Sequence, residues 1–203
     1  NSRLRRRRRF IFVTSILAVI ALALCSTMLM LGNTIYPVND VISVLLGEQV
    51  QGASFAVGTI RLPRMIAGVF AGFSFGVGGY VFQTMLRNPL ANPNVIGITA
   101  GSSAAAVFCI IVLQASNTIV SIASVVGGLA TVLVIYFLSK GSSFSIGRLI
   151  LIGIGIQAML TAVINYLMLI GNTHDLPTAM RWLSGSLNGA KMENLYPLII
   201  TVC

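Results

Sequence analysis

Long apolar runs separated by short polar segments dominate the chain. The runs are continuous rather than alternating, which is typical of membrane-crossing helices and not of barrel strands. About 20 helical residues cross the ~30 Å hydrocarbon core of a bilayer, so the pattern predicts five complete spans and the start of a sixth. The predicted spans cover residues 10–32, 64–86, 95–113, 118–138 and 147–170, and the sixth starts near residue 195.

The last predicted span is incomplete. Its apolar run stops at Cys203, and a helix that ends inside lipid leaves backbone polar groups without partners. We therefore expect residues 10–203 to be an incomplete transmembrane domain that continues into further spans.

The composition agrees with this class. Of the 203 residues, 56% are hydrophobic and 8% are charged, whereas soluble domains have about 25% charged residues. The sequence therefore predicts an all-α polytopic membrane protein. The three cysteines lie inside apolar runs, so we expect no disulfide framework and no metal centre.

Basic residues predict the orientation of the chain in the membrane. Residues 1–9 form a basic N-terminus with six arginines, next to the first apolar run. Such a run fits a cytoplasmic anchor near anionic lipid better than a nucleic-acid site. With the N-terminus in the cytoplasm, the inside segments hold nine of the 13 Lys and Arg residues and no acidic residue. The sequence therefore predicts a multi-pass membrane protein with its N-terminus in the cytoplasm.

Small residues recur along the second span at helical spacing. Gly68, Gly72 and Gly76 fall on one face, where bare backbone lets another helix approach closely. Helix packing is preferred here over direct pore lining. Gly127-Gly128 and Gly153-x-Gly155 predict further close crossings in the fourth and fifth spans.

Arg61 and Arg64 flank the start of the second span in the stretch RLPR. Pro63 fits a helix start, because its missing N–H would be unpaired there. The predicted topology puts both arginines outside. They are either interfacial anchors or a docking pair for carboxylates on an external partner.

The stretch MLRNPLANPNVIG, residues 85–97, separates the second and third spans. Pro89 and Pro93 each disfavour helix at the preceding residue, so a turn is predicted. Charge counting puts this turn inside. It is either a plain connector or part of the mouth of a pathway.

An ordered set of motifs resembles the permease subunits of ABC importers for iron–siderophores, haem and cobalamin (type II importers, FecCD-like). The motifs are RLPR, a Gly-rich helix with Gln83 near its end, NPLA-x-P, G-I-x-x-G from Gly97, RLILIGIGIQAM and MRWLSGSLNGA. They cover essentially everything after the N-terminal arginines.

The resemblance implies a location in the bacterial cell (inner or plasma) membrane, a fold of ten spans per subunit and a set of partners. Two permease subunits, alike or different, would work with two ATP-binding subunits and an extracytoplasmic substrate-binding protein. In this family acidic side chains of the binding protein meet arginines of the permease, which makes Arg61 and Arg64 docking candidates. ATP and Mg would be bound by the partner ATPase, and no cofactor by this chain.

The resemblance also implies positions for the gates. Asn88 and Leu90 match the turn beside the cytoplasmic constriction. Ser145, Ile146 and Gly147 match a second gate segment, although Ile146 and Gly147 depart from its small hydroxyl residues. Arg181 and Trp182 match a short helix at the outer vestibule, with an interfacial anchor as the alternative.

Transport by alternating access, without covalent chemistry, is the function that these features predict. The resemblance implies that the cargo is an iron–siderophore or a related metal chelate. No P-loop pattern occurs in the sequence, and no enzyme activity or catalytic residue is expected. An ion-coupled secondary transporter or a channel is the alternative. Such proteins usually carry an ionisable relay inside the membrane, and no Asp, Glu, Lys or His lies in a predicted span.

Overall fold

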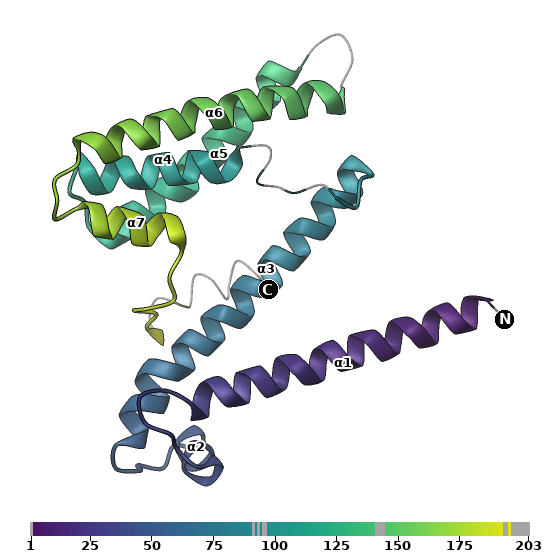
Figure 1. Cartoon of the computed structure of the whole chain (residues 1–203), viewed down its shortest axis with the longest axis vertical. Coiled ribbons are helices and arrows are strands. Elements are labelled where there is room, and N and C mark those ends of the chain that lie inside the picture. Colours follow the sequence, from purple (N-terminus) through teal and green to yellow (C-terminus); the bar gives the residue numbers. More distant parts are fainter. Residues whose placement is uncertain are drawn as a thin grey trace. The chain divides into compact units, whose positions relative to one another are not determined.

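Helices form most of the part of the chain that the structure describes. The computed structural model describes residues 2–90, 92, 94, 97–140, 145–192 and 195, and no strand occurs among them. The elements are α1 (Ser2–Met30), α2 (Val38–Leu45), the π-helix η1 (Ser54–Arg61), α3 (Leu62–Leu86), α4 (Ile98–Ile111), α5 (Asn117–Ser139), α6 (Ile146–Ile170) and α7 (Leu176–Ser184) (Figure 1). The predicted all-α class is confirmed.

Four segments are long and apolar enough to cross a membrane. They are Arg3–Met30, Ser54–Leu86, Asn117–Ser139 and Ile146–Ile170. The bounds of α3, α5 and α6 lie within two residues of the predicted spans. Helix α1 begins at Ser2, so the N-terminal arginines form the first turns of the same helix rather than a separate segment. The start of the predicted sixth span lies outside the described residues, apart from Leu195.

The predicted third span, 95–113, is wrong in length. Helix α4 has only 14 residues, roughly 21 Å at 1.5 Å per residue. Gly97 adopts a left-handed conformation before it, and Gln114 adopts one (φ 47°) after it. The backbone conformation at both ends therefore makes α4 shorter than its apolar run.

Two elements before α3 were not predicted, namely α2 and η1. Pro63 is the second residue of α3, as a helix-starting proline should be, but the helical backbone already runs through η1 before it. Helix nucleation is unfavourable, so helices this short are marginal on their own. The elements α2 and η1 therefore depend on tertiary packing.

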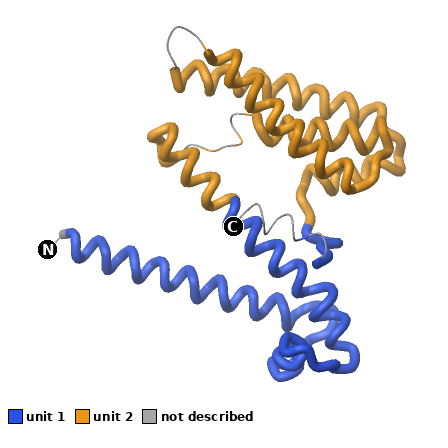
Figure 2. The backbone as a smooth tube through the Cα atoms, turned by 180° about the vertical axis from the view of Figure 1, so that it is seen from behind, with its two compact units in different colours: residues 1–74, 187–203 blue, residues 75–186 orange. Residues whose placement is uncertain are grey.

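The chain divides into two compact units, residues 1–74 with 187–203 and residues 75–186 (Figure 2). In the first unit, Leu29 at the end of α1, Val41 in α2 and Val57 in η1 form a small buried cluster. Tyr36 and Met65 pack against it. The end of α1, α2 and η1 therefore form one packed corner.

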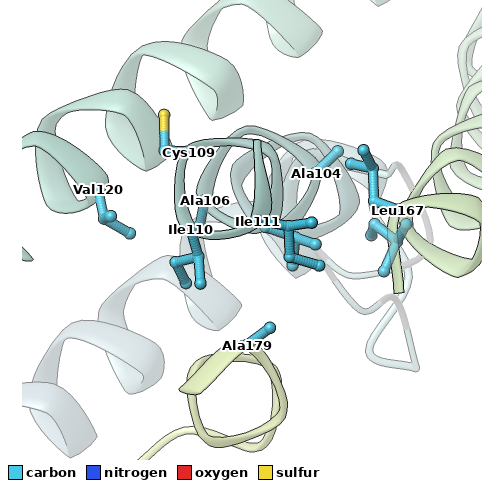
Figure 3. Close-up of a cluster of buried hydrophobic side chains, with 10 residues drawn as sticks. Ala104, Ala106, Cys109, Ile110, Ile111, Val120, Leu167 and Ala179 are labelled. Carbon is cyan, nitrogen blue, oxygen red and sulfur yellow. The ribbon is translucent and has the colours of Figure 1, made fainter. Parts of the chain in front are cut away.

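In the second unit, α4 is the central helix. Its residues Ala106, Val107 and Ile110 are buried and pack with residues of α5, α6 and α7, among them Val120, Leu167 and Ala179 (Figure 3). Because α5, α6 and α7 bury most of its residues fully or partly, α4 does not need the length of a helix that crosses the bilayer in contact with lipid.

Glycines bring α4 against its neighbours. A Cβ on Gly101 would overlap the side chain of Thr131 in α5, and one on Gly127 would lie 2.5 Å from Ala105 Cβ. Gly97 is left-handed (φ 82°), and a Cβ there would lie 3.1 Å from the Gly153 carbonyl oxygen of α6. The close crossings predicted at Gly127-Gly128 and Gly153 are confirmed, whereas Gly155 has nothing within 4 Å among the described atoms.

Candidate functional site

The end of α3 is closed by a Schellman motif that uses an arginine. The Arg87 N–H donates to the Thr84 carbonyl at 3.2 Å, and the Asn88 N–H donates to the Gln83 carbonyl at 3.1 Å. Arg87 holds the left-handed position (φ 51°) where glycine is usual. Its positive charge suits a helix C-terminus, and Pro89 prevents the helix from continuing, as predicted.

Two asparagine side chains shape the loop that follows. The Leu90 N–H donates to Asn88 Oδ1 at 2.9 Å, and the Asn94 N–H donates to Asn92 Oδ1 at 3.0 Å. These are consecutive Asx turns, in which a side-chain oxygen replaces a backbone acceptor. The Thr99 hydroxyl then donates to Asn94 Oδ1 at 2.7 Å and ties the loop to α4.

The loop forms one wall of a cavity of about 500 Å³ within the second unit. Leu90 lies at this cavity, and its side chain is 89% exposed. The cavity is lined by Phe75, Gly79, Gln83, Leu90, Asn92, Asn94, Ile98 and Thr99. The cavity walls thus include side-chain amides, one hydroxyl group and the exposed side chain of Leu90.

The second predicted gate segment lies at the start of α6. Ser145 is the N-cap residue with an extended backbone, and Ile146 and Gly147 are the first residues of the helix. All three are exposed. Since α4 and α5 run antiparallel and α6 returns from the end of α5, this segment and the 88–94 loop lie at the same end of the bundle (Figure 1).

The two predicted docking arginines have different surroundings within the first unit. The Arg61 guanidinium donates to the carbonyl oxygens of Leu29, Met30 and Thr34 at 2.7–2.9 Å. Arg64 donates to the Asn188 side-chain oxygen. Arg64 also lines two cavities of about 440 and 480 Å³, the second of which includes Lys191. Docking by these arginines stays a prediction.

Arg181 and Trp182 lie on α7, and the short helix predicted there is confirmed. Ala179 packs this helix onto α4, while Arg181 and Trp182 are exposed. Both side chains are therefore available at the surface of the second unit. Their vestibule role stays a prediction.

The glycine stripe of α3 makes little contact in the described part of the chain. A Cβ on Gly68 would meet the Leu187 side chain at 3.4 Å, and Gly72 and Gly76 have nothing within 4 Å. Helix packing through this stripe stays a prediction.

A groove along α6 that contains three polar side chains was not predicted from the sequence. The shallow groove is lined by Ile154, Gln157, Ala158, Thr161, Ala162 and Asn165. Gln157, Thr161 and Asn165 are spaced by four residues and so share one face of the helix. The Thr161 hydroxyl donates to the Gln157 carbonyl at 2.8 Å, and Asn165 is exposed. The four-residue spacing of polar residues inside an apolar run was the signal available in the sequence.

Comparison with protein families gives a match over nearly the whole chain. A profile described as the FecCD transport family matches residues 16–203. Among curated proteins, the achromobactin transport system permease CbrC of Dickeya dadantii is 33% identical over 178 residues, which are 87% of this chain and 51% of that protein. The ferric enterobactin permease FepG of Escherichia coli is 33% identical over 80% of this chain and 50% of its own length.

A cobalamin import permease, BtuC of Halobacterium salinarum, is 32% identical over 73% of this chain and 41% of that protein. The chain thus spans about half the length of the curated relatives it matches. Among solved structures, an inward-facing ABC transporter assigned to the metal-chelate type has a TM-score of 0.76 and 26% identity, with 95% of this chain and 59% of that chain covered.

Proposed function

The chain belongs to the FecCD transport family, and from this premise we propose that it is a membrane-spanning permease subunit of a type II ABC importer. Its cargo is an iron–siderophore or a related metal chelate. It moves the cargo by alternating access between an outward-open and an inward-open state. ATP and Mg are bound by a separate pair of ATP-binding subunits, and an extracytoplasmic binding protein delivers the cargo to two permease subunits.

The loop after α3 carries this proposal. It presents Leu90 at a cavity lined by Gln83, Asn92 and Asn94, at the same bundle end as the start of α6. A leucine at a constriction closes a pore by excluding water, and neighbouring amides let polar cargo pass when it opens. This arrangement supports a cytoplasmic gate formed by Asn88, Leu90 and the segment Ser145–Gly147.

The opposite face receives the external partner in this proposal. Arg64 donates to the uncharged side chain of Asn188, and no acidic side chain among the described residues forms an ion pair with it. An acidic side chain of the binding protein is the group that such a cation recognises best. Arg181 and Trp182 line the vestibule that the cargo enters. The N-terminus, with its arginines, lies in the cytoplasm.

Inactivating the partner ATPase is expected to reduce uptake to background. We suggest measuring uptake of a radiolabelled ferric siderophore by the assembled transporter, with wild-type and hydrolysis-deficient ATPase subunits. ATP-driven closure of the ATP-binding subunits supplies the free energy for the conformational change, so the loss of uptake should be complete. A protonophore should have little effect on short-term uptake. Uptake that survives the ATPase variant and collapses with the protonophore would instead establish the secondary transporter.

Replacing Asn88 with Ala is expected to lower uptake several-fold. The change removes the acceptor for the Leu90 N–H, and one such bond contributes about 0.5–1.5 kcal/mol, or about 2–12-fold in the population of the ordered turn. Asn88→Asp keeps an acceptor oxygen and should retain most of the uptake. If Asp and Ala are equally defective, the amide group itself, rather than the turn, is what the gate needs.

A further inference from the structure

The Arg61 guanidinium caps the C-terminal end of α1. Nη1 donates to the carbonyl oxygens of Leu29 at 2.9 Å and Met30 at 2.8 Å, and Nη2 donates to that of Thr34 at 2.7 Å. Leu29 and Met30 belong to the last turn of α1, where carbonyl groups have no partners within the helix. A cation there also interacts favourably with the helix dipole.

The segment after α1 encloses the same guanidinium. Its carbon lies 5.1 Å from the centre of the Tyr36 ring, a cation–π distance, and the Tyr36 hydroxyl donates to the Gly52 carbonyl at 3.0 Å. A Cβ on Gly32 would lie 2.5 Å from Arg61 Nη2. Gly32 therefore leaves the space that the guanidinium occupies.

The backbone of Arg61 is held in place as well. Arg61 is the last residue of η1, and Val57 of the same element is fully buried against Leu29 and Val41. The Leu62 N–H continues the π-type pattern by donating to the Val57 carbonyl. The side chain thus reaches from a packed anchor to the end of a helix 31 residues earlier in the sequence.

Arg61 and Arg64 line the same cavity, together with Leu31, Gly32 and Thr34 of the segment after α1 and with Ala56 and Ile60 of η1. One of the carbonyls that Arg61 binds, that of Thr34, belongs to a residue of this lining. Among the described residues of this corner, no other polar contact joins Thr34 to η1.

We propose that Arg61 is a positioning residue that fastens the end of α1 to η1 and thereby shapes the cavity wall beside Arg64, while Arg64 makes the charged contact with the external partner. The two arginines of RLPR therefore have separate tasks. A lysine cannot replace Arg61, because one ammonium group does not reproduce a planar fork directed at three carbonyls. The charged contact of Arg64 with an external partner rests on the proposed function, whereas the cap that Arg61 forms on α1 does not.

The test compares Arg61→Gln, Arg61→Lys, Gly32→Ala and Arg64→Gln in the full-length permease. Hydrogen exchange over residues 29–36 reports the cap, and the salt dependence of binding-protein docking reports the charged contact. Arg61→Gln and Arg61→Lys should each speed exchange at least about tenfold, because local opening is what exchange measures. Gly32→Ala displaces the guanidinium without changing any charge, so it should also speed exchange, and it covers the case in which Arg61→Gln fails to fold.

Arg64→Gln should leave exchange over residues 29–36 unchanged and make docking less dependent on salt, since removal of a rim charge changes the association rate and its salt dependence. The Arg61 and Gly32 variants should keep the wild-type salt dependence. Unchanged exchange in Arg61→Gln, or a wild-type result for Arg61→Lys, would overturn the cap. A salt dependence weakened by Arg61→Gln and not by Arg64→Gln would overturn the division of tasks. Absence of docking in the wild type would refute the proposed function and leave the exchange result standing.

Discussion

Replacing Gly101 with Ala is expected to destabilise the permease by about 1–3 kcal/mol, the usual range for an overpacked core. The new methyl group would overlap the Thr131 side chain in α5, and the Gly127 carbonyl oxygen would lie only 3.0 Å away. Neither helix can move aside easily, because α4 is also packed against α6 and α7. The melting temperature of the detergent-solubilised full-length protein measures the effect.

Gly78→Ala is the matched control. It makes the same change inside a helix of the same unit, at a position with nothing within 4 Å. Since alanine favours helix over glycine by about 0.5–1 kcal/mol, this variant should be neutral or slightly more stable. Equal effects at both positions would show that helix propensity, not the crossing, decides the outcome.

A second substitution should partly rescue Gly101→Ala. Thr131→Gly removes both atoms that the new methyl group would overlap, Oγ1 and Cβ. The rescue stays partial because this change also removes the bond from the Thr131 hydroxyl to the Gly127 carbonyl. A double variant less stable than either single variant would place the damage elsewhere than at this contact.

Replacing Thr161 and Asn165 together with Leu is expected to reduce uptake at least about tenfold, because an apolar constriction excludes water. Both residues line the groove of α6, and Asn165 is exposed on a helix long enough to span the membrane. An amide facing hydrocarbon is unfavourable, so we expect this face to line the aqueous pathway. Radiolabelled uptake at matched expression measures the effect.

Val163→Leu is the control, since residue 163 lies about 200° around the helix from residue 161. Val163 is itself exposed, and it should face lipid and tolerate the change. Single cysteines at 161, 163 and 165, in a background without Cys25, Cys109 and Cys203, give an independent readout. A water-soluble maleimide should label positions 161 and 165 only. Protection of all three positions would mean that another helix fills the groove.

The spans were predictable because long apolar runs leave few alternatives for the backbone. The bounds of α5 and α6 follow their runs to within one residue. Helix α4 departs from its run because the left-handed residues Gly97 and Gln114 end it, and their conformations depend on tertiary contacts. The same holds for η1, whose packing against α1 and α2 joins distant parts of the sequence.

The motifs gave the positions of the candidate site residues but not their contacts, and the roles predicted for these residues stay predictions. Asn88 appeared as a small polar gate residue, whereas its oxygen is bound to the Leu90 N–H. Arg61 appeared as one of two equivalent arginines, and its three acceptors lie 27–32 residues earlier in the sequence. Neither pairing can be read from spacing, because each depends on where the backbone turns. Glycine spacing likewise marked α3, while the tightest glycine contacts between helices lie at Gly101, Gly127 and Gly128.

The stretch from Gly97 to Gly101 places two close contacts one helical turn apart. Gly97 lies against α6 and Gly101 against α5, so the first turn of α4 is wedged between two long helices. At the other end of the loop, Arg87 holds a left-handed conformation, which costs about 1 kcal/mol or more, whereas Gly97 is held by close contacts with α6. We therefore expect a displacement of Leu90 to change the backbone at Arg87 more readily than at Gly97.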